Sequence, residues 1–169
     1  MSHFIYLVRH GEQQDAEFGL PDGPLSERGK RQAAAIADRL ASVPFTGAWH
    51  SPLQRAAETA EIIQSRLGGV TEEEIEAGSA QMADAVSEFL TPARGDRHDL
   101  LVTHNFVISW FVREVLDAPS WRWLGINQAN AGLTIIRVRS AKPPALVTHN
   151  DLGHLPPELR TGLPVEQPY

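Results

Sequence analysis

The sequence of 169 residues contains no cysteine. A protein without thiols forms no disulfide framework, no thiolate-bound zinc site and no iron–sulfur cluster. The short patterns GxxxxGKS/T, GxGxxG and HExxH are missing as well. Their absence leaves nucleotide-binding and zinc-protease functions without support from the sequence.

A long apolar segment is also missing. Only the five residues Phe4–Val8 form an apolar run before Arg9. This run is too short for the core of a signal peptide or for a membrane span. We therefore expect a cytoplasmic protein that has no membrane as a partner.

Basic residues are fewer than acidic ones, 15 against 21, and the net charge is −6. Nucleic acid is therefore not expected as the main partner, because such binding requires a basic surface. A small phosphate-bearing substrate is not excluded, since the local field of a pocket decides what binds there.

The hydrophobic fraction of 42% and the charged fraction of 21% are those of a soluble globular protein. Apolar runs predict strands, and helical periodicity predicts helices between them. The predicted strands are Phe4–Val8, Thr46–His50, Val70–Ala77, Asp99–Thr103, Leu133–Val138 and Ala145–Thr148. Three helices are predicted to begin after Ser26, Ser51 and His104, and a fourth is predicted at Gln81–Leu90. This alternation predicts an α/β fold with a largely parallel sheet. No linker or repeat divides the chain, so we expect one domain over residues 1–169 with an irregular, proline-rich tail over residues 155–169.

Two serines are predicted to cap helices. Ser26 precedes an apolar-periodic stretch and is a good N-cap. Ser51 is interpreted as a second N-cap, with Pro52 as the first helical residue, because proline fits where its missing N–H would be unpaired anyway.

Chemically active side chains follow three of the predicted strands at their carboxyl ends, which is where ligands bind in open α/β sheets. The first strand delivers Arg9, His10 and Gly11, the second delivers His50 and Ser51 with Arg55 on the next turn, and the fourth delivers His104 and Asn105. Four of these side chains are expected to converge on one point above the sheet, and all four are cationic or can become so: Arg9, His10, Arg55 and His104.

A cluster of cationic side chains of this kind is suited to bind an anion. The guanidinium forks of Arg9 and Arg55 match phosphate oxygens two at a time. A neutral imidazole such as that of His10 is a good nucleophile towards phosphorus. His104 can donate hydrogen bonds as charge builds on the phosphate oxygens, and Gly11 allows a close approach of the backbone to the ligand.

Four motifs in order resemble the histidine phosphatase superfamily, the phosphoglycerate-mutase-like enzymes. They are Leu7-Val8-Arg9-His10-Gly11-Glu12, the segment Pro24–Ala33, the segment Ser51–Ala60 and Leu101-Val102-Thr103-His104. A later part of the chain resembles, more loosely, the mitochondrial mutase-like serine/threonine protein phosphatases. This part comprises Asn105–Ile108, Asn130–Gly132 and Asp151–Pro157.

The resemblance implies a fold, a site and a reaction. The fold is a three-layer sandwich with a mostly parallel central sheet and a minimal lid. His10 would become phosphohistidine, and Arg9, Arg55 and His104 would hold the phosphoryl group, with Gly11 and Asn105 among the phosphate-binding residues. Water would then hydrolyse the intermediate. Neither a metal ion nor a cofactor is needed, because the arginines neutralise the phosphate charge.

The general acid is left open between two glutamates. The family supplies a Glu or Asp from the segment after the second-arginine helix, which here is the acidic run Thr71–Gly78. In an extended segment Glu74 and Glu76 share a face. Glu74 has the family's spacing of four residues before a glycine, whereas Glu76 is nearer the strand end and is preferred.

Three functions remain open. The first is a phosphomonoester hydrolase that acts on a phosphorylated small molecule or a phosphoprotein. The second is a phosphoglycerate mutase, which is less favoured because only 49 positions separate Arg55 from His104, leaving little lid to exclude water. The third is a non-catalytic phosphate-binding or scaffold domain. The sequence does not specify an oligomeric state.

Overall fold

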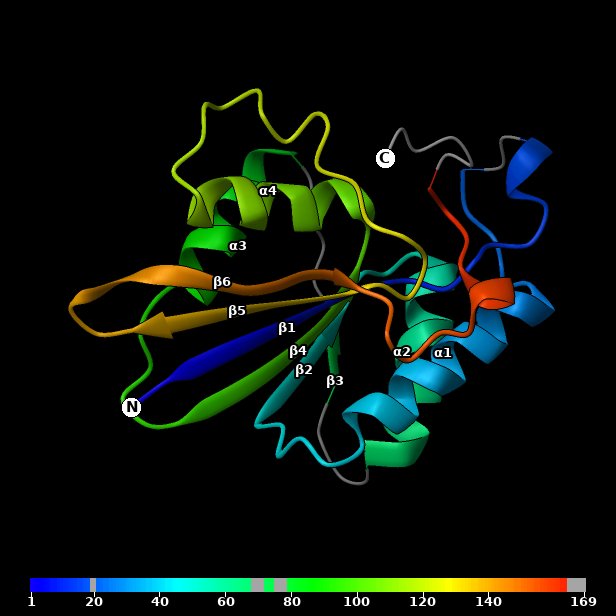
Figure 1. Cartoon of the computed structure of the whole chain (residues 1–169), viewed down its shortest axis with the longest axis horizontal. Helices are drawn as coiled ribbons and strands as arrows, with labels where there is room; N and C mark the ends of the chain where they lie inside the picture. The colour runs from blue at the N-terminus through cyan, green and yellow to red at the C-terminus, as the bar shows by residue number, and fades with distance from the viewer. Residues whose placement is uncertain (19–20, 68–71, 75–78, 164–169) are drawn as a thin grey trace.

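A computed structural model describes residues 1–18, 21–67, 72–74 and 79–163. The strands are β1 (His3–Arg9), β2 (Gly47–His50), β3 (Glu72–Glu74), β4 (Arg97–Thr103), β5 (Leu133–Arg139) and β6 (Lys142–Asp151). The α-helices are α1 (Glu27–Leu40), α2 (Gln54–Leu67), α3 (Ser79–Phe89) and α4 (Asn105–Val115). Two short 3-10 helices lie at Ala16–Phe18 (η1) and Pro157–Leu159 (η2). The sheet has the order β3-β2-β4-β1-β5-β6. Helices α1 and α2 cover one face and α3 and α4 the other (Figure 1). No helix in these ranges is long and apolar enough to cross a membrane.

The two faces of the sheet bury separate apolar cores. Successive side chains of a strand point to opposite faces, so β1 contributes Val8 to one core and Ile5 to the other. Val8 packs with Ile36 of α1 and Ile63 of α2, whereas Ile5 packs with Phe111 of α4. The predicted three-layer α/β sandwich is therefore confirmed.

The sheet is mixed rather than uniformly parallel. The four neighbouring strands β3, β2, β4 and β1 are parallel to one another, as predicted, whereas β5 is antiparallel to both β1 and β6. Only two residues, Ser140 and Ala141, separate β5 from β6, and a connection this short joins only antiparallel strands. The parallel half carries the site residues.

The predicted start of α2 is wrong. The helix begins at Gln54, so Ser51 and Pro52 lie before it. The backbone N–H of Gln54 donates to Oδ2 of Asp22 at 2.9 Å, and this distant carboxylate stabilises the helix start. By contrast, Ser26 is the N-cap of α1, and its hydroxyl accepts from the N–H of Gly29 at 3.0 Å.

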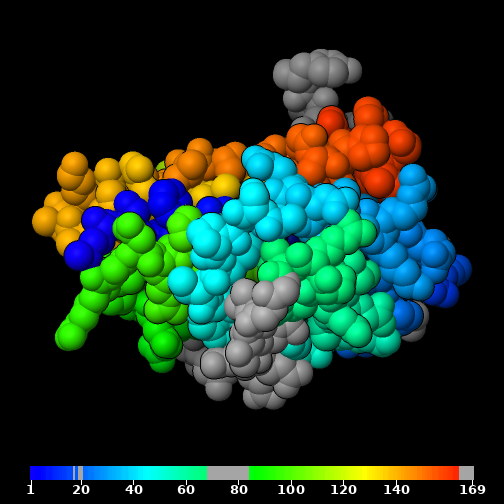
Figure 2. Space-filling model, turned by 90° about the horizontal axis from the view of Figure 1, so that it is seen from below, coloured from blue at the N-terminus to red at the C-terminus, as the bar shows by residue number. Residues whose placement is uncertain are grey.

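The described part of the carboxyl-terminal tail packs on its own domain. Leu155 and Leu159 are buried in the core that α1 and α2 share. The Nε2 amide group of Gln32 in α1 donates to the carbonyl of Leu159 at 2.6 Å and to Oγ1 of Thr161 at 2.8 Å. Figure 2 shows the red carboxyl-terminal residues seated against the blue residues of α1. This packing brings the tail next to the strand end that carries Arg9.

Candidate active site

Three adjacent parallel strands bring the predicted site residues together. In the order β2-β4-β1, the last residue of β1, Arg9, pairs with Thr103, and His50 of β2 pairs with Val102. The residues that follow then meet at one edge of the sheet. The rings of His10 and His104 lie 5.1 Å apart, centroid to centroid, at an interplanar angle of 59°.

One ring nitrogen of His10 is hydrogen-bonded to the backbone, and the other faces the cationic cluster. Its Nδ1–H donates to the carbonyl of Gly11 at 2.7 Å, which leaves the lone pair on Nε2. Nε2 accepts from Nε of Arg55 at 3.2 Å. Burial, with the charges of His104, Arg9 and Arg55, holds the pKa of His10 well below its usual value, against an opposing effect of the Gly11 carbonyl. The ring is therefore neutral at neutral pH and has a free electron pair.

Arg55 connects the two histidines. Its Nε points to His10, and its NH2 group lies 3.4 Å from Nδ1 of His104. The NH1 group is held by Oδ1 of Asp22 at 2.9 Å and by the carbonyl of Pro21 at 3.0 Å. Burial of Asp22 opposes ionisation, but N–H bonds from Gln54 and Gly23 and the charge of Arg55 together lower the pKa of Asp22. Asp22 therefore stays charged and fixes the guanidinium beside His10.

Arg9 is positioned by the carboxyl-terminal half of the chain. Its NH1 group donates to the carbonyl of Gln128 at 2.5 Å and to that of Gly162 at 3.0 Å. Burial, with the charge of Arg55, lowers the pKa of Arg9 to about 10, so the side chain is cationic at neutral pH. Its Nε is buried and has no hydrogen-bond partner among the described residues. An unpaired buried donor of this kind suits an anionic ligand.

Gly162 is required for this arrangement. It has a positive φ of 87°, a conformation that glycine adopts without steric cost. A Cβ at this position would lie 2.1 Å from Oδ1 of Asn130 and 2.9 Å from NH1 of Arg9. The tail can therefore reach Arg9 only with glycine here.

His104 lies between Ser51 and Phe106. Its Nε2 is 2.7 Å from the hydroxyl of Ser51, the residue that the sequence had assigned to a helix cap. The ring of Phe106 stacks on that of His104 at 6.0 Å and 7°, although Phe106 is 45% exposed. Burial, with the charges of Arg55 and Arg9, lowers the pKa of His104 to about 4.

These two histidines make the stability of the protein depend on pH. A histidine whose pKa is lower in the folded than in the unfolded chain takes up a proton on unfolding, so stability falls as the pH drops below the unfolded pKa. For His104 the loss runs from pH 6.5 to about 4 and amounts to roughly 3 kcal/mol at about 1.4 kcal/mol per unit. His10, whose pKa is also lowered, adds to the loss in the same direction.

We expect the free energy of unfolding, measured by urea denaturation, to fall between pH 6.5 and 4.5. The slope should be smaller in His104→Gln and unchanged in His98→Gln, whose ring contacts Tyr6 and Phe4 instead of the cluster. Asp22 and Asp99, whose pKa values are lowered from 3.8, lose their contribution only below that value. A slope that is equal in wild type and His104→Gln would contradict the assignment.

Gly11 has a packing role in addition to the predicted ligand contact, which stays a prediction. A Cβ on Gly11 would lie 2.6 Å from the carbonyl oxygen of Gly29, and one on Gly29 would lie 2.2 Å from that of Glu12. The two glycines therefore allow the segment after β1 to lie directly on the first turn of α1. The N–H of Gly11 donates to Oγ1 of Thr59 at 3.0 Å, which ties this segment to α2 as well.

Asn105 is engaged away from the two histidines. Its Nδ2 donates to Oδ1 of Asn127 at 3.1 Å, and its Oδ1 accepts from the N–H of Gln128 at 2.7 Å. Gln128 in turn supplies the carbonyl that holds Arg9. The second N–H of Nδ2 stays available as a donor, and the predicted phosphate contact of Asn105 stays a prediction.

The choice of general acid also stays a prediction. The backbone of Glu74 pairs with that of His50 at the end of β2, which is the edge of the sheet where the site lies. Glu76 falls outside the described residues. Among the side chains that the structure describes, no group of three or more histidines and carboxylates is placed to hold a metal ion.

Comparison with known families agrees with this geometry. The sequence model of the histidine phosphatase superfamily (branch 1) matches residues 5–80 and 69–152. The chain belongs to this superfamily. In this chain the two histidines of the site are His10, which follows β1, and His104, which is the N-cap of α4.

Individual relatives include phosphatases and a mutase. The chain is 28% identical to the mitochondrial serine/threonine-protein phosphatase Pgam5 of Caenorhabditis briggsae over 92% of its own length and 65% of that protein. It is 27% identical to the probable phosphoglycerate mutase GpmB of Escherichia fergusonii over 89% of its own length and 94% of that protein. The chain thus spans less than two thirds of the Pgam5 sequence that it matches.

Solved structures share the fold. The crystal structure of a phosphoserine phosphatase from Entamoeba histolytica, in complex with 3-phosphoglyceric acid, superimposes with a TM-score of 0.75 at 18% sequence identity. The match covers 90% of this chain and 99% of that one. The crystal structure of a phosphoglycerate mutase from Plasmodium falciparum superimposes with a TM-score of 0.69 at 22% identity, over 100% of this chain and 98% of that one. The predicted phosphoglycerate-mutase-like fold is therefore confirmed.

Proposed function

We propose that this protein is a metal-independent phosphomonoester hydrolase in which His10 carries the phosphoryl group. The observation that carries the proposal is the environment of His10. Its Nδ1–H is fixed by Gly11, and its Nε2 faces Arg55 within a cluster that also contains Arg9 and His104. Membership of the histidine phosphatase superfamily supports the same reaction.

In the first step the lone pair of His10 Nε2 attacks phosphorus, and the bond from phosphorus to the ester oxygen breaks. The carbonyl of Gly11 accepts the Nδ1–H bond and so stabilises the positive charge that the ring acquires. Arg9 and Arg55 balance the charge on the phosphoryl oxygens. The leaving oxygen takes a proton, for which Glu76 or Glu74 is the predicted donor.

In the second step water attacks phosphorus and the bond from phosphorus to Nε2 breaks, while one proton of the water returns to the carboxylate that protonated the leaving oxygen. Inorganic phosphate leaves, and His10 returns to its neutral form with the Nε2 lone pair restored. A low pKa of the His10 ring favours this return, because the cluster disfavours a proton on Nε2.

Hydrolysis is favoured over transfer to a second substrate. Only 49 positions separate Arg55 from His104. The rest of α2, together with β3, α3 and β4, occupies most of them, so little chain is left for a lid that excludes water. The names of two relatives, a serine/threonine-protein phosphatase and a phosphoserine phosphatase, support hydrolysis of a phosphorylated small molecule or a phosphoprotein. The cytoplasmic location stays a prediction from the sequence.

The test is a direct measurement of where the phosphoryl group goes. A labelled phosphoserine peptide, 4-nitrophenyl phosphate and labelled 3-phosphoglycerate are each incubated with the protein and an excess of unlabelled 2-phosphoglycerate as acceptor, in the presence of EDTA. We expect label in inorganic phosphate, with oxygen from ¹⁸O-water incorporated. Label mainly on the acceptor would instead assign a mutase, and binding without turnover would assign a scaffold domain.

Ser51 is expected to control the tautomer of His104. In the structure Nδ1 of His104 accepts from the NH2 group of Arg55 at 3.4 Å, so Nε2–H donates to Ser51. When a phosphoryl group takes the place of this contact, Nδ1 can donate to a phosphoryl oxygen only if the hydrogen has moved to Nδ1. A Ser51 hydroxyl that donates to Nε2 allows that tautomer. Loss of one such buried hydrogen bond costs about 1–2 kcal/mol, or roughly tenfold in rate.

We therefore expect Ser51→Ala to lower kcat/KM roughly tenfold and Ser51→Thr to restore it. The ¹⁵N shifts of His104 should move from the Nδ1–H to the Nε2–H pattern in the alanine variant while phosphate is bound. Equal kinetics and unchanged shifts would show that the hydroxyl only packs.

A further inference from the structure

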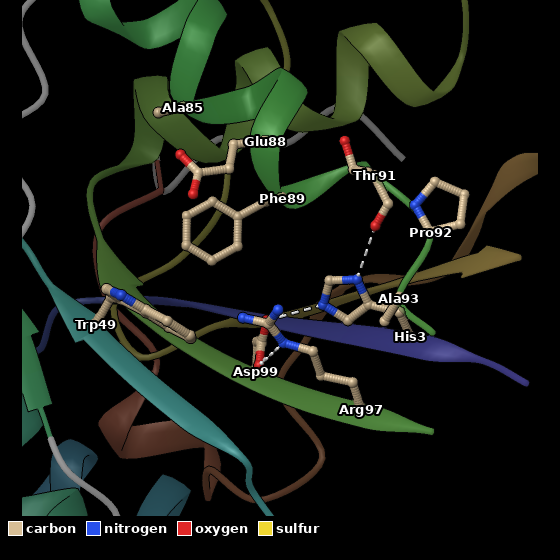
Figure 3. A pocket seen from close by; sticks show the side chains of 10 residues that line it. All are labelled: His3, Trp49, Ala85, Glu88, Phe89, Thr91, Pro92, Ala93, Arg97 and Asp99. Atoms are coloured by element: carbon tan, nitrogen blue, oxygen red, sulfur yellow. Dashed lines mark hydrogen bonds and ion pairs between the residues drawn. The ribbon is translucent and has the colours of Figure 1, made fainter. Parts of the chain in front are cut away.

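A cavity lies at the opposite end of the sheet from His10. It has a volume of about 410 Å³ and is bounded by the beginnings of β1 and β4, by β2 and by the end of α3. Figure 3 shows the side chains that line it, among them His3, Trp49, Phe89, Arg97 and Asp99. His3 begins the same strand that Arg9 ends, so the two sites are separated by the length of β1, about 20 Å at roughly 3.3 Å per residue.

A buried carboxylate organises the polar side of the cavity. Asp99 is fully buried. Its oxygens lie 2.8 Å from Nε2 of His3 and 2.7–2.8 Å from Nε of Arg97, and one of them accepts from the Thr46 hydroxyl at 3.2 Å. Nδ1 of His3 faces the carbonyl of Thr91 at 3.3 Å. Asp99 and His3 therefore have their hydrogen bonds satisfied within the protein.

The guanidinium of Arg97 has a free edge, formed by its two terminal nitrogens. Asp99 engages only its Nε, and the two terminal nitrogens have no hydrogen bond to the described residues that line the cavity. Figure 3 shows the guanidinium between Trp49 and His3 and below Phe89. The side chain is 43% exposed, so a ligand can reach these nitrogens. Two parallel N–H donors of a guanidinium match a carboxylate.

The other side of the cavity is an aromatic wall. The rings of Trp49 and Phe89 meet edge to face at 5.2 Å and 88°, and the Arg97 guanidinium lies 5.6 Å over the indole. Gly47 is necessary for this wall, because a Cβ there would lie 2.2 Å from the indole ring. The two perpendicular rings thus form an apolar corner beside a cation.

We propose that this cavity binds a small aromatic carboxylate, whose carboxylate pairs with the free edge of Arg97 and whose ring packs on Trp49 and Phe89. The volume suits a single or fused ring, since small-molecule pockets begin at about 300 Å³. A phosphate dianion fits less well, because Arg97 is the one lining cation that keeps free donors among the described residues. In Figure 3 the ring of Phe89 lies between the Glu88 carboxylate and Arg97, so Glu88 does not compete for the guanidinium.

Titration of the intact protein with benzoate and indole-3-carboxylate tests the site, with benzamide as the uncharged control. Saturating phosphate is present so that the cluster around His10 is occupied. We expect a Kd on the order of 1 mM for a ligand of this size, at least tenfold weaker binding of benzamide, and ¹H–¹⁵N shift changes at Ala85, Thr91 and Ala93. Shift changes confined to the His10 end, or equal binding of benzamide, would overturn the proposal.

Two variants locate the contacts. Arg97→Gln removes the charge and should weaken benzoate binding at least tenfold, and Ala93→Phe should block the cavity without touching the Asp99 contacts. Glu88→Gln is the matched control and should leave the Kd within about twofold. If Arg97→Gln unfolds the protein, Ala93→Phe alone decides, and unchanged binding in it would overturn the proposal.

Discussion

Replacement of His10 by glutamine is expected to reduce release of phosphate by roughly 10⁴-fold or more. Glutamine keeps a polar group of similar reach but has no electron pair that attacks phosphorus. Nε2 of His10 is the one histidine nitrogen in the cluster that accepts a bond from Arg55 Nε while the opposite nitrogen is locked. A labelled phosphoester should leave acid-labile, base-stable label on the wild-type protein and none on His10→Gln.

His98→Gln is the matched control for the trapping experiment. His98 lies on β4, the strand that leads to His104, and its ring contacts Phe4 and Tyr6. This variant should be labelled to the same extent as the wild type. If His10→Gln were labelled to the same extent as the wild type, or if the label survived acid, the phosphoryl group would lie on another residue and the mechanism would be wrong.

The four charged or titratable residues of the site could be predicted because they follow strands. Strong apolar runs predicted β1, β2 and β4, and parallel strands bring their carboxyl ends to one edge. The structure brings Arg9, His10, Arg55 and His104 together, as predicted. For His10 and His104 the short-range context, a strand followed directly by a polar residue, was sufficient, whereas Arg55 lies on the first turn of the helix after β2.

The residues that position them could not be predicted in the same way. Asp22 holds Arg55 across 33 positions, and Gly162 holds Arg9 across 153. Nothing in a local pattern connects residues so far apart, and the cluster Pro21-Asp22-Gly23-Pro24 predicts only a turn. The one local signal was the Ser51-Pro52 pair, and it was misread, because an N-cap pattern does not show which partner a serine hydroxyl finds in the fold.

Gly11 illustrates a related limit. The glycine after His10 suggested close approach to a ligand, which stays a prediction, and the structure shows close approach to Gly29. Both follow from the absence of a Cβ. The contact with Gly29 could not be predicted, because it depends on the packing of α1 against the segment after β1.

Replacement of Arg55 is expected to have the second largest effect. Lysine keeps the positive charge but loses the planar fork, so it cannot contact His10, His104 and Asp22 at once. We expect Arg55→Lys to lower kcat/KM by roughly 10²–10³-fold, the cost of removing one transition-state donor. Arg55→Ala should lower it further.

The pH profile separates a role in catalysis from one in folding. Arg55 is among the charges that lower the pKa of His10 and of His104. In Arg55→Ala both pKa values should therefore rise, and ¹⁵N titration should show the rings taking up protons at higher pH than in the wild type. Arg66→Ala, at the other end of α2 and in a half-exposed ion pair with Asp38, is the control for loss of charge and should change neither kinetics nor titration. A kcat/KM that falls equally in both variants, with unchanged histidine titrations, would mean that Arg55 acts only through the stability of the helix.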